Sequence, residues 1–159
     1  EELFEVVVGN PPFGGAAEAE HDVYLAWQYH WWRLGARRKA GLPRELWFLE
    51  RSLRLLKPQG LLAMVLPEGL LANRRWRAQR EVLVRDCQIE AVVGLPRSVF
   101  SRGGAAVKTV LLVLRKCRPA PGHQVRLAEL DASELAQASA TLLAEWQQGR
   151  SLASERPWG

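Results

Sequence analysis

The sequence predicts an α/β fold whose sheet is mostly parallel and closes with an antiparallel hairpin. Short apolar runs rich in β-branched residues alternate with segments in which leucines recur at helical spacing. That alternation is typical of parallel strands joined by right-handed crossover helices. The last two apolar runs, residues 89–95 and 107–115, have no helical segment between them, so we expect them to pair as an antiparallel hairpin.

The first half of the chain alternates strand and helix. Residues 2–9 are typical of a strand, and the three valines at 6–8 predict that this strand is buried. A helix is expected at 22–38, where aromatic side chains recur at helical spacing. A second is expected at 44–57, because its leucines mark one buried face and it ends in lysine, proline and glycine. The wholly apolar run 61–66 predicts a strand covered on both faces.

The second half of the chain predicts shorter elements. They are a loop at 67–69, an arginine-rich helix at 74–85, the two hairpin strands with a loop at 96–106, an edge strand at 124–130 and a capped helix at 131–148. We therefore divide the chain into a main unit, residues 1–118, and an extension, residues 119–159. The extension holds the edge strand, the capped helix and a flexible tail.

The composition is that of an ordinary globular protein, with 159 residues of which 48% are hydrophobic and 25% charged. No apolar run is long enough to span a bilayer and no signal peptide is visible, so we expect a cytoplasmic protein without a membrane partner. The two cysteines and three histidines are scattered without metal-ligand spacing, which predicts free thiols and no metal site.

The net charge of +5 is unevenly distributed. Residues 1–22 carry acidic side chains and no lysine or arginine, whereas basic residues dominate 33–57 and 74–85. A basic surface suits a phosphate backbone and favours a nucleic-acid partner. Solvated helix faces give the same pattern, so the charge alone does not decide between the two.

The strongest functional signal is the turn Asn10-Pro11-Pro12-Phe13, which follows the first expected strand. The two prolines fix their φ angles, remove two backbone donors and hold Asn10 extended. The unpaired carbonyls and the Asn10 side-chain oxygen form adjacent acceptors that suit a planar NH2 group. The ring of Phe13 offers a face on which a base can stack. Taken alone, the tetrapeptide is equally compatible with an ordinary strand-to-loop turn.

Three further blocks follow the turn and make the pattern specific. With them, the chain resembles the N6-adenine DNA methyltransferases, and most of all the modification subunits of type I restriction-modification systems. The resemblance covers about residues 5–118. Its blocks, in order along the chain, are residues 8–13, 48–60, 65–71, and 92–100 followed by 107–111.

The resemblance implies a Rossmann-like class I methyltransferase fold, of which residues 1–118 would form the C-terminal half. It implies that the Asn10 side-chain oxygen and the Pro11 carbonyl accept hydrogen bonds from the N6 amino group of a flipped adenine. Pro12 would stiffen this catalytic turn, and Phe13 would stack on the base. The resemblance also implies S-adenosylmethionine as the cofactor. The implied partners are DNA, the N-terminal half of the same domain and a specificity subunit.

The sequence departs from the family pattern at the cofactor site. The glycine-rich turn that binds S-adenosylmethionine lies upstream of the catalytic turn in that family, and the nine residues before Asn10 do not contain it. The glycine pairs at 14–15 and 103–104 do not join a strand to a helix with the required spacing. We therefore expect Asn10 to border the cofactor, the main cofactor site to be absent, and the isolated chain to be an inactive fragment.

Two alternatives stay open at this level. One is an inactive methyltransferase-derived remnant that binds DNA or a partner subunit without transferring a methyl group. The other is an RNA or protein-glutamine N-methyltransferase, which the leucine-proline blocks near residues 66 and 95 disfavour. Glu68, at an expected strand end, is assigned a structural or loop role.

Overall fold

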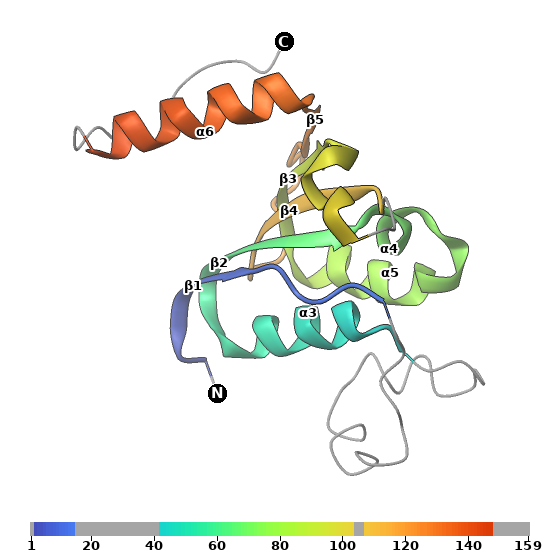
Figure 1. Ribbon diagram of the computed structural model, residues 1–159. Coiled ribbons are helices and arrows are strands. Elements are labelled where there is room, and N and C mark those ends of the chain that lie inside the picture. The colour runs from blue at the N-terminus through green and yellow to red at the C-terminus, as the bar shows by residue number, and fades with distance from the viewer. Residues whose placement is uncertain (1, 15–41, 104–106, 148–159) are drawn as a thin grey trace.

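The computed structural model describes residues 2–14, 42–103 and 107–147, which form a five-stranded sheet in the order β1-β2-β4-β3-β5 (Figure 1). The strands are β1 (Phe4–Gly9), β2 (Leu56–Pro67), β3 (Gln88–Leu95), β4 (Thr109–Arg115) and β5 (Arg126–Glu129). β1 runs parallel to β2 and β3 runs parallel to β5, whereas β4 lies antiparallel between β2 and β3. Four strands therefore share one direction, which confirms the predicted mostly parallel sheet and its antiparallel hairpin.

Two helices, α3 (Arg44–Leu55) and α5 (Arg77–Asp86), lie beside each other on one face of this sheet (Figure 1). The core forms between them and the strands. On β2, the buried Leu62, Met64 and Leu66 alternate with side chains that stay partly exposed. The expectation that this strand is covered on both faces is therefore wrong for the described residues, because α3 and α5 both pack on the same face.

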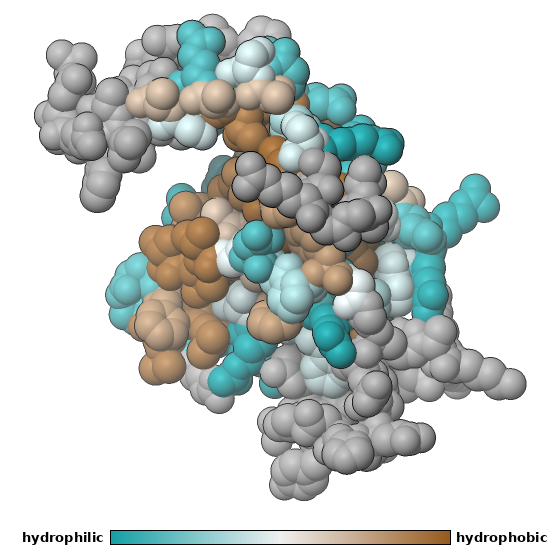
Figure 2. All heavy atoms as spheres, viewed as in Figure 1, coloured by the Kyte–Doolittle hydropathy of each residue, from teal (hydrophilic) through white to brown (hydrophobic). Residues whose placement is uncertain are grey.

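β1 lies at the edge of the described sheet and pairs with β2 alone. Val6 is 56% exposed and Val8 is 77% exposed, so the prediction of a buried strand is wrong for the described part of the chain. Val7 packs against the core, so Val6 and Val8 on either side of it point to the opposite face of the sheet, where the described residues leave β1 uncovered. Figure 2 shows hydrophobic side chains gathered where β1 begins in Figure 1, and the exposed apolar residues there include Leu3 and Phe4.

The connections differ from the sequence-based expectations in detail. The loop expected at 67–69 instead starts α4 (Glu68–Ala72), a helix of barely more than one turn. The helix expected at 74–85 is divided into a 3-10 turn, η1 (Arg74–Trp76), and α5, because the Asn73 side chain accepts the Arg75 N–H at 2.8 Å and caps η1. The loop expected at 96–106 contains the 3-10 segment η2 (Arg97–Gly103).

The helix α6 (Ala132–Gln147) follows β5 and confirms the expected capped helix. The Asp131 carboxylate accepts the N–H groups of Ser133 and Glu134, and the Glu134 carboxylate accepts the N–H of Asp131. The helix expected at 22–38 and the expected tail lie outside the described residues. None of the described helices is both long and apolar enough to cross a membrane.

Candidate active site

The turn Asn10–Phe13 leaves β1 at the carboxyl edge of the sheet, where sites in open α/β folds lie. Gly9, the last residue of β1, is opposite Met64 of β2, and a Cβ at this position would lie 3.0 Å from the Met64 Cε atom. Glycine therefore lets the Met64 side chain pack closely at the point where the turn begins. Asn10 is exposed, and its amide forms no hydrogen bond within the described residues.

The rest of the turn is anchored to a different degree at each residue. Pro11 is buried, Pro12 is exposed and Phe13 is half-buried. A buried proline next to an exposed asparagine fixes the backbone while leaving the Asn10 side-chain oxygen open to a ligand. The structure thus places all four predicted site residues in one turn, with the Asn10 side chain exposed.

An aromatic partner for the turn comes from η2, after the carboxyl end of β3. The rings of Phe13 and Phe100 lie 5.2 Å apart between centroids, with their planes at 75°. This edge-to-face geometry is a favourable one for aromatic pairs. No role for Phe100 followed from the sequence pattern, although the residue belongs to the fourth matching block. Its place in a strand-end loop was the signal that could have identified it.

A buried carboxylate holds the other end of the turn. The Gly14 N–H, directly after Phe13, donates a hydrogen bond of 2.6 Å to Glu45 Oε1 at the start of α3. Glu45 is only 3% exposed. Gly14 has a φ of +81°, in the left-handed region that glycine adopts without a steric penalty. Sequence analysis missed this contact because the two residues are 31 positions apart.

Ion pairs connect the neighbouring strand ends at the same edge of the sheet. The Lys108 ammonium lies 3.2 Å from carboxylate oxygens of both Glu129 and Glu68. These two carboxylates, Glu129 first, raise the pKa of Lys108. The Glu68 N–H also donates to the Lys108 carbonyl at 2.9 Å. Glu68 therefore links the start of α4 to the residue before β4.

A basic turn follows α4 on the same side of the molecule. Arg74, Arg75 and Arg77 are exposed, and the Arg75 guanidinium lies 4.6 Å from the centroid of the Trp76 ring. Trp76 itself is buried, so it fixes the base of this turn. Such a cluster of cations can contact a phosphate backbone.

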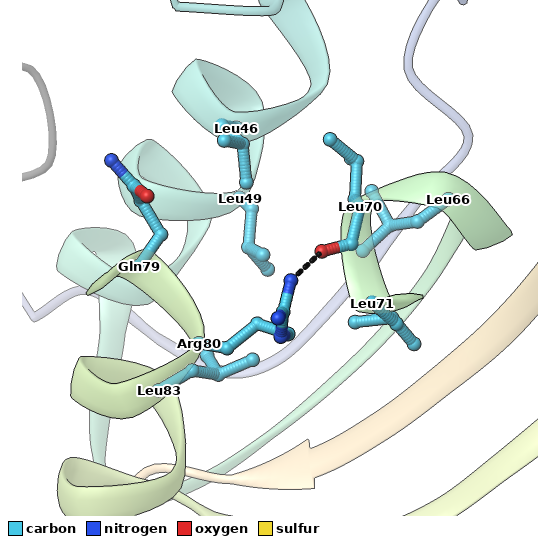
Figure 3. Close-up of a pocket in the computed structure, with 8 residues that line it drawn as sticks. All are labelled: Leu46, Leu49, Leu66, Leu70, Leu71, Gln79, Arg80 and Leu83. Carbon is cyan, nitrogen blue, oxygen red and sulfur yellow. Dashed lines mark hydrogen bonds between the residues drawn. The ribbon is translucent and has the colours of Figure 1, made fainter. Parts of the chain in front are cut away.

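Beneath the basic turn lies a small apolar cavity of about 10 Å³ (Figure 3). The Arg80 guanidinium enters this region and donates hydrogen bonds to the Leu70 carbonyl at 3.2 Å and the Asn73 carbonyl at 2.6 Å. These bonds satisfy carbonyls at the end of α4. The cavity has the volume of one water molecule and leucine walls, so its residues support the basic turn rather than bind a ligand.

The described glycines lie at separate places in the fold. Gly14 follows the turn at residues 10–13, while Gly60 and Gly94 lie within β2 and β3. None of the described glycines belongs to a glycine-rich turn that joins a strand to a helix ahead of β1. Within the same residues, no group of three or more His, Cys, Asp or Glu side chains is placed to hold a metal ion.

Comparison with known proteins gives a consistent result. The chain is 29% identical over 120 residues to the methylase subunit of the type I restriction enzyme EcoEI from Escherichia coli, a match that covers 75% of this chain and 22% of that protein. It is 28% identical over 120 residues to a Methanocaldococcus jannaschii protein described as a type II restriction enzyme and methyltransferase, covering 75% of this chain and 9% of that protein.

Solved structures share the fold. A protein from Listeria monocytogenes described as a class I S-adenosylmethionine-dependent methyltransferase matches 91% of this chain and 42% of its own, with a TM-score of 0.66 and 22% identity. The M protein of the type I restriction enzyme EcoKI matches 73% of this chain and 21% of its own, with a TM-score of 0.51 and 24% identity. The expected class I methyltransferase fold is thereby confirmed.

The chain thus spans about a fifth of the first of these curated relatives. The sequence profile of the family described as N-6 DNA Methylase matches residues 1–145, which is most of the chain and includes both the turn at residues 10–13 and the aromatic pair. This chain is therefore a member of the N-6 DNA methylase family.

Proposed function

We propose that this chain forms the base-binding half of a DNA adenine-N6 methyltransferase that acts in restriction-modification. The observation that carries the proposal is the catalytic turn at the carboxyl end of β1, with Asn10 exposed and Phe13 packed against Phe100. The family and its restriction-modification relatives support the same reaction.

In this proposal the turn binds an adenine that has left the DNA helix. The Asn10 Oδ1 atom and the Pro11 carbonyl accept hydrogen bonds from the two protons of the N6 amino group. These bonds localise the lone pair on the nitrogen and make it a better nucleophile. The base stacks on Phe13, and the inclined Phe100 ring closes one side of the pocket. The geometry favours an exocyclic amino group over a ring atom, because a pair of acceptors matches two N–H donors.

The methyl donor of the proposed reaction is S-adenosylmethionine, which the class I fold implies. We propose that residues other than the described ones hold most of it, next to Asn10. The position of β1 at the edge of the described sheet supports this, because an edge strand leaves backbone N–H and C=O groups available to pair with a further strand. That strand would belong to the other half of the domain. The isolated chain would then bind S-adenosylmethionine negligibly and would transfer no methyl group.

The proposed partners are DNA and a specificity subunit, and the proposed location is the cytoplasm. The exposed arginines at 74, 75 and 77 support DNA binding, since they lie after α4, which begins at the carboxyl edge that also carries the catalytic turn. Cations at this place can contact phosphates on either side of a flipped base. The relatives from type I enzymes support a subunit that selects the DNA sequence.

The test uses the complete natural polypeptide that carries this sequence. Radiolabelled methyl transfer from S-adenosylmethionine to unmethylated DNA is measured, and N6-methyladenine is identified after nuclease digestion. We expect Asn10→Ala to lower the rate by at least about 100-fold, as loss of a hydrogen-bonding group from a reaction centre does, while binding of S-adenosylmethionine is retained. Gln137→Ala is the matched control, because it removes an exposed side-chain amide from α6, outside the proposed site.

Three outcomes would contradict the proposal. Wild-type rates in Asn10→Ala would remove that residue from the reaction. DNA binding without methylation by the wild-type protein would identify an inactive remnant, and methylation of RNA or of a protein glutamine would change the substrate class. Calorimetry on the 159-residue chain tests the proposal that other residues hold most of the cofactor. Micromolar binding of S-adenosylmethionine would show that this chain holds the cofactor by itself.

A further inference from the structure

We propose that Glu45 is a positioning residue for the catalytic turn, acting through its hydrogen bond to the Gly14 N–H. The inference rests on the proposed function of that turn. It begins from the 2.6 Å bond between Gly14 N and Glu45 Oε1, which joins the start of α3 to the residue directly after Phe13. No role for Glu45 follows from the sequence pattern, because a glutamate in the first turn of a helix is common on solvated surfaces.

The burial of Glu45 makes this bond significant. The residue is 3% exposed, and its second carboxylate oxygen, Oε2, is buried and has no hydrogen-bond partner among the residues that the structure describes. Burying a carboxylate is costly unless it is hydrogen-bonded. An ordinary surface position would leave both oxygens in water at no cost. The carboxylate is therefore placed where it can accept from the turn, and a bond to a charged acceptor is stronger than a neutral one.

The bond fixes one specific peptide unit. The Gly14 nitrogen belongs to the peptide group whose carbonyl carbon is that of Phe13, so holding Gly14 N–H also holds the backbone at Phe13. On the preceding side, Pro12 has a fixed φ. The Phe13 ring itself contacts Phe100. The stacking ring is thus held through its backbone on both sides and through its side chain.

The support for this bond is rigid. Glu45 lies between Leu42 and Leu46, which are 2% and 4% exposed and belong to the main core. The start of α3 therefore cannot shift without disturbing the packing against β2. The turn is tied to the core through Glu45, and not only through its connection to β1.

A matched control on the same helix distinguishes positioning of the turn by Glu45 from a general contribution of Glu45 to stability. Glu50 is also buried, at 5% exposed, and its carboxylate pairs at 3.0 Å with Arg54 of α3 itself. Both residues are buried carboxylates of one helix, but the ion pair of Glu50 stays within α3 and does not reach the turn. The two measurements below use three variants, which are Glu45→Ala, Glu45→Gln and Glu50→Ala.

The first measurement is hydrogen exchange of the Gly14 amide by NMR, in the 159-residue chain. Loss of one such bond predicts exchange at least about tenfold faster in Glu45→Ala. Glu50→Ala should leave Gly14 exchange unchanged even if it lowers the overall stability. Equal Gly14 exchange in the wild type and Glu45→Ala overturns the proposal, whatever the enzyme activity shows.

The second measurement is steady-state methylation by the complete polypeptide. We expect Glu45→Ala to lower kcat about 10- to 100-fold, the scale that a small misplacement of a reacting group produces. KM for DNA should change little, because the residue does not touch the substrate. Glu45→Gln keeps an acceptor oxygen and should recover most of the rate. Wild-type kcat in Glu45→Ala overturns the proposal. A wild-type protein without methylation would instead refute the proposed function, and Gly14 exchange would still decide whether Glu45 holds the turn.

Discussion

The contact between Phe13 and Phe100 gives a quantitative prediction for the stability of this chain. The two rings meet edge to face at 5.2 Å, although positions 13 and 100 are far apart in the sequence. Such pairs contribute about 0.5–1.5 kcal/mol beyond the area they bury. A double-mutant cycle with Phe13→Leu and Phe100→Leu isolates this coupling, because leucine keeps most of the apolar volume and removes the ring.

Urea unfolding of the four proteins supplies the free energies of unfolding. We expect the losses in free energy of unfolding caused by the two single substitutions to add up to more than the loss caused by the double substitution. The difference should be about 0.5–1.5 kcal/mol. Phe48→Leu is a suitable control, because Phe48 is exposed on α3 and is not in this aromatic pair. It should show no coupling with Phe13→Leu. Additive effects at positions 13 and 100 would refute the contact, and with it the role of Phe100 in closing the base pocket.

Two further predictions concern buried polar groups. The Thr109 hydroxyl is buried and has no hydrogen-bond partner among the described residues, so Thr109→Val should raise the free energy of unfolding by about 1 kcal/mol in urea titrations; a loss of stability would reveal a partner for the hydroxyl. Burial, then Asp86, raises the pKa of the Cys87 thiol from its ordinary value of 9.0 to about 11. Because the unfolded chain releases the Cys87 proton at a lower pH than the folded chain, the free energy of unfolding should fall between pH 9 and pH 11, by up to about 3 kcal/mol, and Cys87→Ala should flatten that dependence.

The strand and helix pattern was predictable because it depends on local periodicity. The leucines of α3 recur at helical spacing and the apolar runs of β2, β3 and β4 have no such period, so sequence alone identified these elements. α4 was missed because a five-residue helix contains too few residues to show a period, and Pro67 and Gly69 favour a loop. The exposure of β1 was missed for a different reason. Apolar side chains indicate that a strand is suited to burial, but they do not say which segment covers it.

The turn at residues 10–13 could be predicted as a candidate site because its four residues are contiguous and two of them are prolines. Phe100 and Glu45 could not be predicted as its neighbours, because their contacts with Phe13 and Gly14 arise when separate loops and helix ends meet at the carboxyl edge of the sheet. A buried glutamate and a solvated one look identical in a sequence. Their difference is set by how the start of α3 packs in the folded chain.

Asn10 differs from its neighbours in burial and in contacts. Its side chain is exposed and makes no hydrogen bond within the described residues, whereas Pro11 and Glu45 are buried and Phe13 packs on Phe100. Asn10→Ala should therefore change the free energy of unfolding by less than about 0.5 kcal/mol, as surface substitutions usually do. Urea unfolding of the 159-residue chain measures this, and Asn73→Ala, which removes a capping hydrogen bond, is the comparison variant that should lose more stability. A large loss of stability would mean that the Asn10 amide is bound within the fold, and that it is not available to accept from a base.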